Sequence, residues 1–563
     1  MDRDRLSGRS GACPDGSAAG DSPADCREGR GGGLSNTLLH TTAARSDRRI
    51  LSDAGTFLGA SWIAQAIGTI RSFAVARILS PDRFGLLQLA LLVFEYARSS
   101  HGGLLFGMTK EASRAVGSGD ESRLHRSKDV AFTGALVLGA LALVGVPLFA
   151  WLRPDASIEA RVAVGAGIFA ALVHQVHTFY VALLRAQRRV GDASLTIVVF
   201  HASYALLAIV AAWRFGVTGV YFALVASYAA VSLLAWRRSR WRFKFSFDIG
   251  TTRGLLRRGV PVLVVTFLFR LISSIDKILV THLFGLTGLG LYGLAKRAGG
   301  IAGGAAESVR WVTLPTFLED VGRGSDPALH RARLLTIVGG MSFLLPPALA
   351  TAALLCHLPL VWFLPEYVAA ANPARVILLG AGFLSLAGVP RSLLVALDRE
   401  PKLVAAQLAT ILGTVALVLF VAGRGGGLVG TAVATVAVQG LYAATVLALA
   451  LDATGLGALE TSKQVLRLLA PQIAVIWAVV AVGIHSSGSA ASQPFLPWNW
   501  SWPQGVSGTV SAVLLVWIAS LAIGAYCGSS RPLTGALRER SRGDRAEGPT
   551  RRTNDSVVGG PVA

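Results

Sequence analysis

Residues 403–422 read LVAAQLATILGTVALVLFVA, and residues 428–451, after a short turn rich in Gly, read LVGTAVATVAVQGLYAATVLALAL. Neither window contains Asp, Glu, Lys or Arg. A helix needs about 20 consecutive apolar residues to cross the hydrocarbon core of a bilayer, so each window is long enough for one crossing. The two windows therefore predict a helical hairpin that crosses a membrane twice.

The same pattern recurs along most of the chain. The 563 residues are 53% hydrophobic and only 15% charged, whereas soluble proteins contain about 25% charged residues. We therefore expect an all-α polytopic membrane protein with about 14 transmembrane helices. Their approximate ranges are 54–79, 84–108, 129–151, 160–184, 192–213, 216–236, 259–284, 288–314, 334–356, 374–396, 403–422, 428–451, 469–485 and 506–527.

The positive charge indicates how the chain is oriented. A net charge of +21 is typical of nucleic-acid-binding proteins, but here Lys and Arg gather in the loops on one side of the predicted spans. The opposite loops hold only Arg83, Arg153, Arg214 and Arg424. Cytoplasmic loops retain excess Lys and Arg, so we predict that both termini lie in the cytoplasm. Abundant Ala, Gly and Arg with few Lys indicate a bacterial source, so the expected membrane is the bacterial cytoplasmic (inner) membrane. The lipid bilayer is the expected partner, and nucleic acid is not.

The chain divides into tails and a repeated membrane region. Residues 1–50 and 529–563 are polar and lack apolar periodicity, so we expect disordered cytoplasmic tails, the second of them basic. Gly85 and Gly290 hold equivalent places in the first hairpin of two successive sets of six helices. This predicts an N-terminal six-helix lobe (helices 1–6, 51–245), a C-terminal six-helix lobe (helices 7–12, 246–455) and two additional transmembrane helices (456–528).

Three segments resemble the polysaccharide biosynthesis or oligosaccharide flippase family, within the multidrug/oligosaccharidyl-lipid/polysaccharide exporter superfamily. They are FAVARILSPDRFGLLQLA (73–90), DKILVTHLFGLTGLGLYGLAKR (276–297) and AGVPRSLLVALDREPK (387–402). The resemblance implies two six-helix lobes, often with two extra C-terminal helices, that move lipid-linked sugars by alternating access. It also implies a role for Arg71, Arg98 and Arg297, because related flippases of lipid-linked peptidoglycan precursors carry cavity arginines at the matching places.

Charged residues inside the predicted spans point to a polar cavity. A charge at bilayer depth costs at least about 2.5–3.5 kcal/mol, so it normally faces water or a partner. Guanidinium groups bind diphosphates through paired hydrogen bonds. The basic residues in or at the ends of spans are Arg71, Arg98, Arg161, Arg270, Lys277, Lys296, Arg297, Arg310, Arg375 and Arg391. Of these, we predict that Arg71, Arg98, Arg297, Arg270 and Lys296 bind an anionic substrate.

A second set of residues could couple ions or form charge pairs: Glu95, Asp276, Lys277 and Glu307. Glu95 lies three residues before Arg98, which places the two side by side on a helix, as a site or as a buried structural pair. Arg270 could pair with Asp276. We expect no metal, cofactor or catalytic residue, since His174 and His177 have no third ligand nearby in the sequence.

Three classes of function fit these features. The first is a flippase that translocates polyprenyl-diphosphate-linked glycan units for exopolysaccharide, capsule or O-antigen assembly, with polysaccharide polymerase or export machinery as further candidate partners. The alternative transporter is a cation-coupled exporter of drugs or small molecules from the same superfamily. The second class is an enzyme, a membrane-embedded glycan polymerase or ligase. The third class is a non-transporting scaffold in a polysaccharide synthesis complex. The expected cationic cavity favours the flippase, and we do not expect an enzyme.

Overall fold

The computed structural model of the chain describes residues 32–118, 120–187, 189–239, 242–322, 325–486 and 517–518. The chain divides into two compact units, Met1–Ser52 and Asp53–Ala563, and the description below concerns the second. The predicted tail 529–563 lies outside the described residues, as does nearly all of the predicted span 506–527. Of the predicted tail 1–50, residues 1–31 also lie outside them, and the first helix begins at Gly32.

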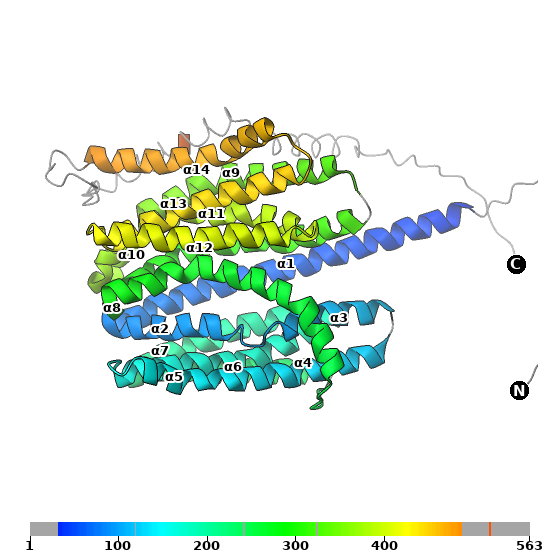
Figure 1. Cartoon of the computed structure of the whole chain (residues 1–563), viewed down its shortest axis with the longest axis horizontal. Coiled ribbons are helices and arrows are strands. Elements are labelled where there is room, and N and C mark those ends of the chain that lie inside the picture. The colour runs from blue at the N-terminus through cyan, green and yellow to red at the C-terminus, as the bar shows by residue number, and fades with distance from the viewer. Residues whose placement is uncertain are drawn as a thin grey trace, which may run out of the picture. The chain divides into compact units, whose positions relative to one another are not determined.

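The described residues are helical with short connections, and they contain no strand. Figure 1 shows the helices running roughly along one direction. In chain order the elements are α1 (Gly32–Ile78), α2 (Pro81–Ala97), α3 (Leu104–Ser118), α4 (Glu121–Leu141), η1 (Ala142–Val144), α5 (Gly145–Leu152), α6 (Ile158–Ala186), α7 (Val190–Arg238), α8 (Ile249–Gly322), α9 (Pro327–Leu355), α10 (His357–Phe363), η2 (Pro365–Ala370), α11 (Ala371–Ala396), α12 (Glu400–Gly423), α13 (Gly427–Asp452) and α14 (Ala458–Ser486).

The helices have the length and composition of membrane spans. Within the described residues, eight helical segments are long and apolar enough to cross a bilayer. They include the hairpin of α12 and α13, which was predicted from its two uncharged windows. The chain is therefore a multi-pass membrane protein. The total of about 14 spans remains a prediction.

Two glycines divide long helices where the sequence predicts separate spans. Gly216 interrupts α7 with φ 62°, and Gly285 interrupts α8 with φ 68°. This left-handed backbone carries no steric cost for glycine, because glycine has no Cβ. Each glycine thus separates two helical segments, at the boundaries predicted between spans 192–213 and 216–236 and between spans 259–284 and 288–314.

The predicted span 84–108 is broken in the structure. α2 ends at Ala97, and α3 begins at Leu104 after a turn. Gly102 and Gly103 in this turn have φ values of 59° and 95°, which a helix cannot continue through. Arg98, predicted inside the second span, is instead the residue that caps the C-terminus of α2.

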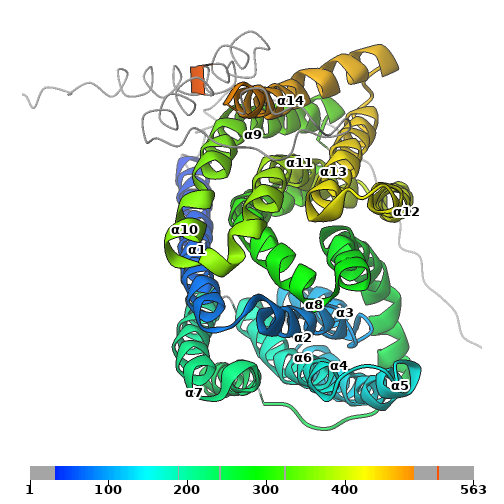
Figure 2. The same ribbon diagram turned by 90° about the vertical axis from the view of Figure 1, so that its left-hand side faces the viewer.

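Two sets of helices pack around separate cores, and α8 touches both. In the first set α2 packs on α6, and α6 packs on α7. In the second set α11 packs on α9 and α13, and α12 packs on α13. α8 contacts α2 and α3 from the first set and α11 and α12 from the second. Figure 2, which looks along the helices, shows α8 between the two sets.

The helix α2 crosses the second half of α8 at very close range. A Cβ built on Gly85 would lie 2.6 Å from the carbonyl carbon of Leu286, and one built on Gly290 would lie 3.0 Å from the carbonyl carbon of Pro81. These distances are shorter than ordinary contacts, so only glycine allows the backbones to approach this closely. The repeated glycines noted in the sequence therefore meet each other. Tyr367 of η2 also donates a hydrogen bond to the Leu79 carbonyl at 2.7 Å.

A second glycine crossing joins α3 to the first half of α8. A Cβ built on Gly259 would lie 2.8 Å from the Gly107 nitrogen and 2.9 Å from the Gly103 carbonyl carbon. An ion pair between Arg258 and Glu111 lies beside it. We call the crossing at Gly85 and Gly290 the first crossing, and this one the second crossing.

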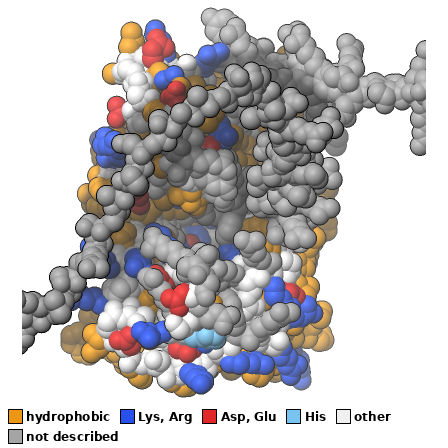
Figure 3. Space-filling view, turned by 90° about the vertical axis from the view of Figure 1, so that its right-hand side faces the viewer, with side chains coloured by type: hydrophobic (Ala, Val, Ile, Leu, Met, Phe, Trp, Pro, Cys, Tyr) orange, Lys and Arg blue, Asp and Glu red, His pale blue; other side chains and the backbone are white. Residues whose placement is uncertain are grey.

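Basic side chains gather at one end of the helices. Figure 3 faces the end at which α3 turns into α4, and it shows Lys and Arg side chains around that end. Several are held by ion pairs between helix ends, such as Arg238 with Asp192 and Arg333 with Asp320. The arrangement agrees with the uneven distribution of Lys and Arg among the predicted loops.

Candidate functional site: a cationic cavity between the two sets of helices

Two cavities lie between the sets of helices and share part of their walls. The first has a volume of about 480 Å³ and the second of about 400 Å³. Glu95 of α2, Phe269 and Ser273 of α8 and Arg391 of α11 line both. The lining residues from α2 and its C-terminal cap lie between Gln88 and Arg98 in sequence. They come after Gly85 of the first crossing and before Gly103 and Gly107 of the second crossing. The cavities therefore lie between the two crossings.

All five side chains predicted to bind an anionic substrate line these cavities. Arg98 and Arg270 line the first cavity, and Arg71, Lys296 and Arg297 line the second. They come from α1, α2 and both halves of α8, so the fold brings together residues that are more than 200 positions apart in the chain. Lys277 lines the second cavity as well.

Arg297 is held in place by packing more than by hydrogen bonds. A Cβ on Gly68 would collide with its guanidinium, so a larger residue at position 68 would displace it. Its Nε and Nη2 atoms are buried and have no hydrogen-bond partner among the described residues. Arg71, on the same cavity, lies over the ring of Tyr204 with 4.1 Å between its Cζ and the ring centroid. The Nε and Nη2 atoms of Arg297 are therefore donors that an anion could use.

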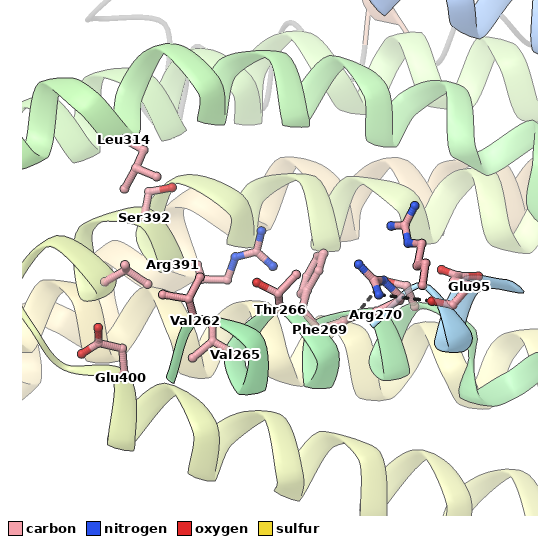
Figure 4. Close-up of a pocket in the computed structure, with 13 residues that line it drawn as sticks. Glu95, Val262, Val265, Thr266, Phe269, Arg270, Leu314, Arg391, Ser392 and Glu400 are labelled. Carbon is pink, nitrogen blue, oxygen red and sulfur yellow. Dashed lines mark hydrogen bonds between the residues drawn. The ribbon is translucent and has the colours of Figure 1, made fainter. Parts of the chain in front are cut away.

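Arg270 joins α8 to the C-terminus of α2. Its Nη1 donates to the backbone carbonyl of Glu95 at 3.2 Å and to the hydroxyl of Ser99. The last carbonyls of a helix have no partner within the helix, so Arg270 satisfies one of them. Figure 4 shows Arg270 and Glu95 at one end of the first cavity and Glu400 at the other. Arg98 lines the same cavity, and its buried Nε has no partner among the described residues.

The charge pairs differ from those considered in the sequence. Among the described residues, no ion pair joins Glu95 to Arg98 or Arg270 to Asp276. Asp276 is instead paired with Lys296, with 2.8 Å between its Oδ2 and the lysine Nζ. Glu307 lies on α8 outside the residues whose side chains the structure describes. The pairing follows from the fold, because the return of α8 after Gly285 brings position 296 back beside position 276.

Asp276 is fully buried and accepts three hydrogen bonds. Its side chain is 0% exposed. Its Oδ2 accepts from the Tyr292 hydroxyl at 2.8 Å as well as from Lys296, and its Oδ1 accepts from the backbone N–H of Lys277 at 3.0 Å. Removing the cation from such a buried pair costs about 3–5 kcal/mol, because an uncompensated charge is left in the interior.

Arg391 is a cavity residue that the predicted substrate ligands do not include. It lies over the ring of Phe269 with 3.6 Å between its Cζ and the ring centroid, and it lines both cavities. Figure 4 shows it between the two ends of the first cavity. The sequence does place Arg391 among the charges within predicted spans. Its helix, however, lies far in sequence from the helices that carry the other cavity arginines. Among the described residues, no group of three His, Cys, Asp or Glu side chains is placed to hold a metal ion.

Comparisons with known proteins give a family match for part of the chain and a fold for most of it. Residues 50–319 match the family model described as polysaccharide biosynthesis protein. No curated protein matches the sequence. An inward-facing multidrug resistance MATE family transporter of the MOP superfamily superposes with a TM-score of 0.62 and 14% identity, over 73% of this chain and 98% of that one.

Two further solved structures have the same arrangement of helices. The lipid II flippase MurJ in an inward closed conformation superposes with a TM-score of 0.59 and 12% identity, over 85% of this chain and 99% of that one. A MATE protein in complex with MaL6 superposes with a TM-score of 0.53 and 15% identity, over 73% and 96%. Residues 50–319 therefore match the polysaccharide biosynthesis family that the sequence resemblance indicated, and the fold is that of the MATE transporters and MurJ.

Proposed function

We propose that this chain is a flippase that carries polyprenyl-diphosphate-linked oligosaccharide units across the bacterial cytoplasmic membrane, for exopolysaccharide, capsule or O-antigen assembly. The observation that carries the proposal is the set of cationic side chains, Arg71, Arg98, Arg270 and Arg297, around two cavities that share walls. A diphosphate has two negative charges and accepts paired hydrogen bonds from guanidinium groups. The family match over residues 50–319 and the fold support a transporter over an enzyme.

The proposed path follows the two crossings. Helices 1–6 and 7–12 form two lobes, with further helices after them, and both termini lie in the cytoplasm. The basic end shown in Figure 3 is then cytoplasmic, and the second crossing, between α3 and α8, is the inner gate. The diphosphate binds in the cavities while the polyprenol chain stays in lipid between helices. The second crossing and the first crossing then open in alternation, and the sugar reaches the outer face.

A cation-coupled drug exporter fits the cavities less well. The described lining residues include Arg71, Arg98, Arg270, Arg297 and Arg391, and their charge repels a cationic drug. The anionic substrate is therefore the better match to this site. A scaffold has no comparable use for arginines that face a cavity between two sets of helices. A polymerase or ligase needs catalytic groups in an external loop, and the predicted outer loops 357–373 and 486–505 hold a single carboxylate, Glu366.

The proposal is tested by complementation in a bacterial strain that lacks its own repeat-unit flippase. Surface polysaccharide and cytoplasmic accumulation of lipid-linked sugar are measured for wild type, Arg71→Ala, Arg98→Ala and Arg297→Ala at matched membrane levels. Arg77→Ala is the matched control, because Arg77 is exposed on the same helix as Arg71. Losing one charged hydrogen-bonding group costs about 1.5–3 kcal/mol, so substrate affinity should fall roughly 10- to 150-fold in each cavity variant.

The outcomes separate the function from the site. Rescue by wild type and Arg77→Ala, lost in the three cavity variants, supports both. Rescue that survives all three substitutions refutes the assigned site and leaves the flippase standing. Failure of wild type in a panel of strains that make different repeat units contradicts the flippase itself.

A further inference from the structure

The pair formed by Lys296 and Asp276 lies at the boundary between the protein core and the second cavity. The Lys296 side chain is 14% exposed and lines that cavity, whereas Asp276 is 0% exposed and lines neither cavity. An anion in the cavity can therefore reach the cation of the pair but not its carboxylate. The two members of the pair differ in what they can bind.

Lys296 supplies the positive charge that balances Asp276. The other two donors to the carboxylate are the Tyr292 hydroxyl and the backbone N–H of Lys277, which are neutral. Within the described residues, Lys296 is the basic side chain that forms an ion pair with Asp276. If Lys296 turns to another anion, the buried carboxylate keeps its neutral hydrogen bonds and loses its counter-charge.

Another described basic side chain could replace Lys296 as the counter-charge of Asp276 only by leaving the wall of the second cavity. α13 contributes the uncharged Gln439 to this cavity. Tyr96 of α2 is engaged with Ser274, with 2.7 Å between the two hydroxyl oxygens. The charged groups that line the same cavity are Arg71 from α1, Glu95 from α2, Lys277 and Arg297 from α8 and Arg391 from α11.

We propose that Lys296 is an exchangeable substrate ligand: it leaves Asp276 for the diphosphate, and Asp276 takes up one proton in the same step. This inference rests on the proposed function and deepens it, because it couples binding of the lipid-linked diphosphate to a proton. Lys296, Arg297 and Arg71 line one cavity, so the lysine ammonium joins a phosphate site that the arginines already form.

The step balances in charge and in atoms. Before binding, the lysine ammonium and the aspartate carboxylate neutralise each other. After binding, the ammonium is paired with one phosphate oxygen, and a proton taken up from the solution through the cavity forms an O–H bond at Asp276 Oδ2, the oxygen that the ammonium contacted before. The Tyr292 hydroxyl contacts the same oxygen and can rotate to donate or accept. No redox partner is needed.

Linkage between the two events predicts a pH-dependent affinity. If one proton is taken up for each ligand bound, the dissociation constant rises by up to about tenfold for each unit of pH while free Asp276 is ionised. Acidification therefore favours binding, because it supplies the proton that releases Lys296. The same reciprocity requires that ligand binding withdraws protons from solution.

The experiment measures proton uptake and affinity on the purified full-length chain. The probe is polyprenyl-diphosphate-linked N-acetylglucosamine, in which each phosphorus carries one ester bond and shares the anhydride bond. Each phosphate therefore keeps one charge near neutral pH, unlike a phosphate monoester with its second pKa of about 6. A pH-indicator dye in weak buffer reports uptake on binding. Radiolabelled probe reports affinity between about pH 6 and pH 8.

Wild type should take up close to one proton for each probe bound. Asp276→Asn should take up none, and its affinity should not change with pH, because Lys296 is already released. Asp82→Asn is the matched control: it is the same chemical change at an exposed carboxylate of α2 that lines neither cavity, and it should behave as wild type. The double variant Asp276→Asn/Lys296→Gln should also take up no proton, but should bind more weakly than Asp276→Asn.

Three results would overturn the inference. Probe binding by wild type without proton uptake refutes the exchange and leaves the proposed function intact. Uptake that persists in Asp276→Asn and disappears in Glu95→Gln assigns the proton to Glu95 instead. The absence of probe binding by wild type at every pH refutes the proposed substrate and the exchange with it. Wild-type uptake decides the first and third results even if a variant fails to fold.

Discussion

Substituting Gly259 by Ala should open the second crossing, where α3 meets α8. The added Cβ would lie 2.8 Å from the Gly107 nitrogen and closer still to the Gly103 carbonyl oxygen. Ordinary contacts begin at 3.4 Å, so at the nitrogen alone the helices must separate by at least 0.6 Å, the difference between 3.4 and 2.8 Å. Both neighbours are backbone atoms, which cannot turn away as a flexible side chain can.

The cost of this clash applies only while the crossing is closed. Overpacking typically costs about 1–3 kcal/mol. If the open state has no such contact, the full cost shifts the equilibrium between closed and open, by about 5- to 150-fold. Gly254→Ala is the matched control on the same helix, because a Cβ there has nothing within 4 Å.

Spin labels on either side of the crossing measure the shift. Lys110 of α3 and Arg253 of α8 are exposed, and each can be replaced by Cys after the four native cysteines are removed. Electron–electron resonance distances should show a longer component that grows in Gly259→Ala and stays at the wild-type level in Gly254→Ala. If both variants give the wild-type distribution, the close approach of the two backbones does not control this end of the cavity, and the reasoning is refuted.

Three further predictions concern other parts of the fold. Gly85→Ala should disfavour closure of the first crossing, by the same reasoning, and increase the reactivity of labels placed beside it toward membrane-impermeant reagents. Tyr367→Phe keeps the ring but leaves the buried Leu79 carbonyl without its donor, so thermal unfolding in detergent should show a loss of about 1–3 kcal/mol. The Thr251 hydroxyl holds the pKa of Asp248 below its usual range, so the cap that Asp248 forms on α8 stabilises the helix at neutral pH and is lost as the pH falls through that lowered pKa. In Asp248→Ala at neutral pH, hydrogen exchange in the first turn of α8 should therefore increase. An unchanged exchange rate would contradict the cap.

Much of the architecture is legible in the sequence because the bilayer imposes simple rules. A long apolar window must be helical in lipid, since every backbone group needs a partner within the segment. This rule predicts the hairpin at 403–451 and the separate spans on either side of Gly216 and Gly285. It fails at the α2–α3 turn, because hydropathy does not register the positive φ values of Gly102 and Gly103.

The cavity residues were predicted from two signals, the cost of a charge at bilayer depth and the family resemblance that pointed to Arg71, Arg98 and Arg297. Together these signals identify Arg71, Arg98, Arg270 and Arg297, and all four line the cavities. They do not say which charges meet. Arg391 carries the same signal, but its place between the two cavities follows from the packing of α11 on α8.

The sequence by itself determined that the chain is helical and membrane-embedded, that part of it resembles polysaccharide biosynthesis proteins, and that it holds costly charges within its predicted spans. Only the tertiary structure decided that Asp276 pairs with Lys296 and not with Arg270. The reason is geometric: charge attraction is effective over a few ångströms, and the return of the chain after Gly285 sets which side chains come that close.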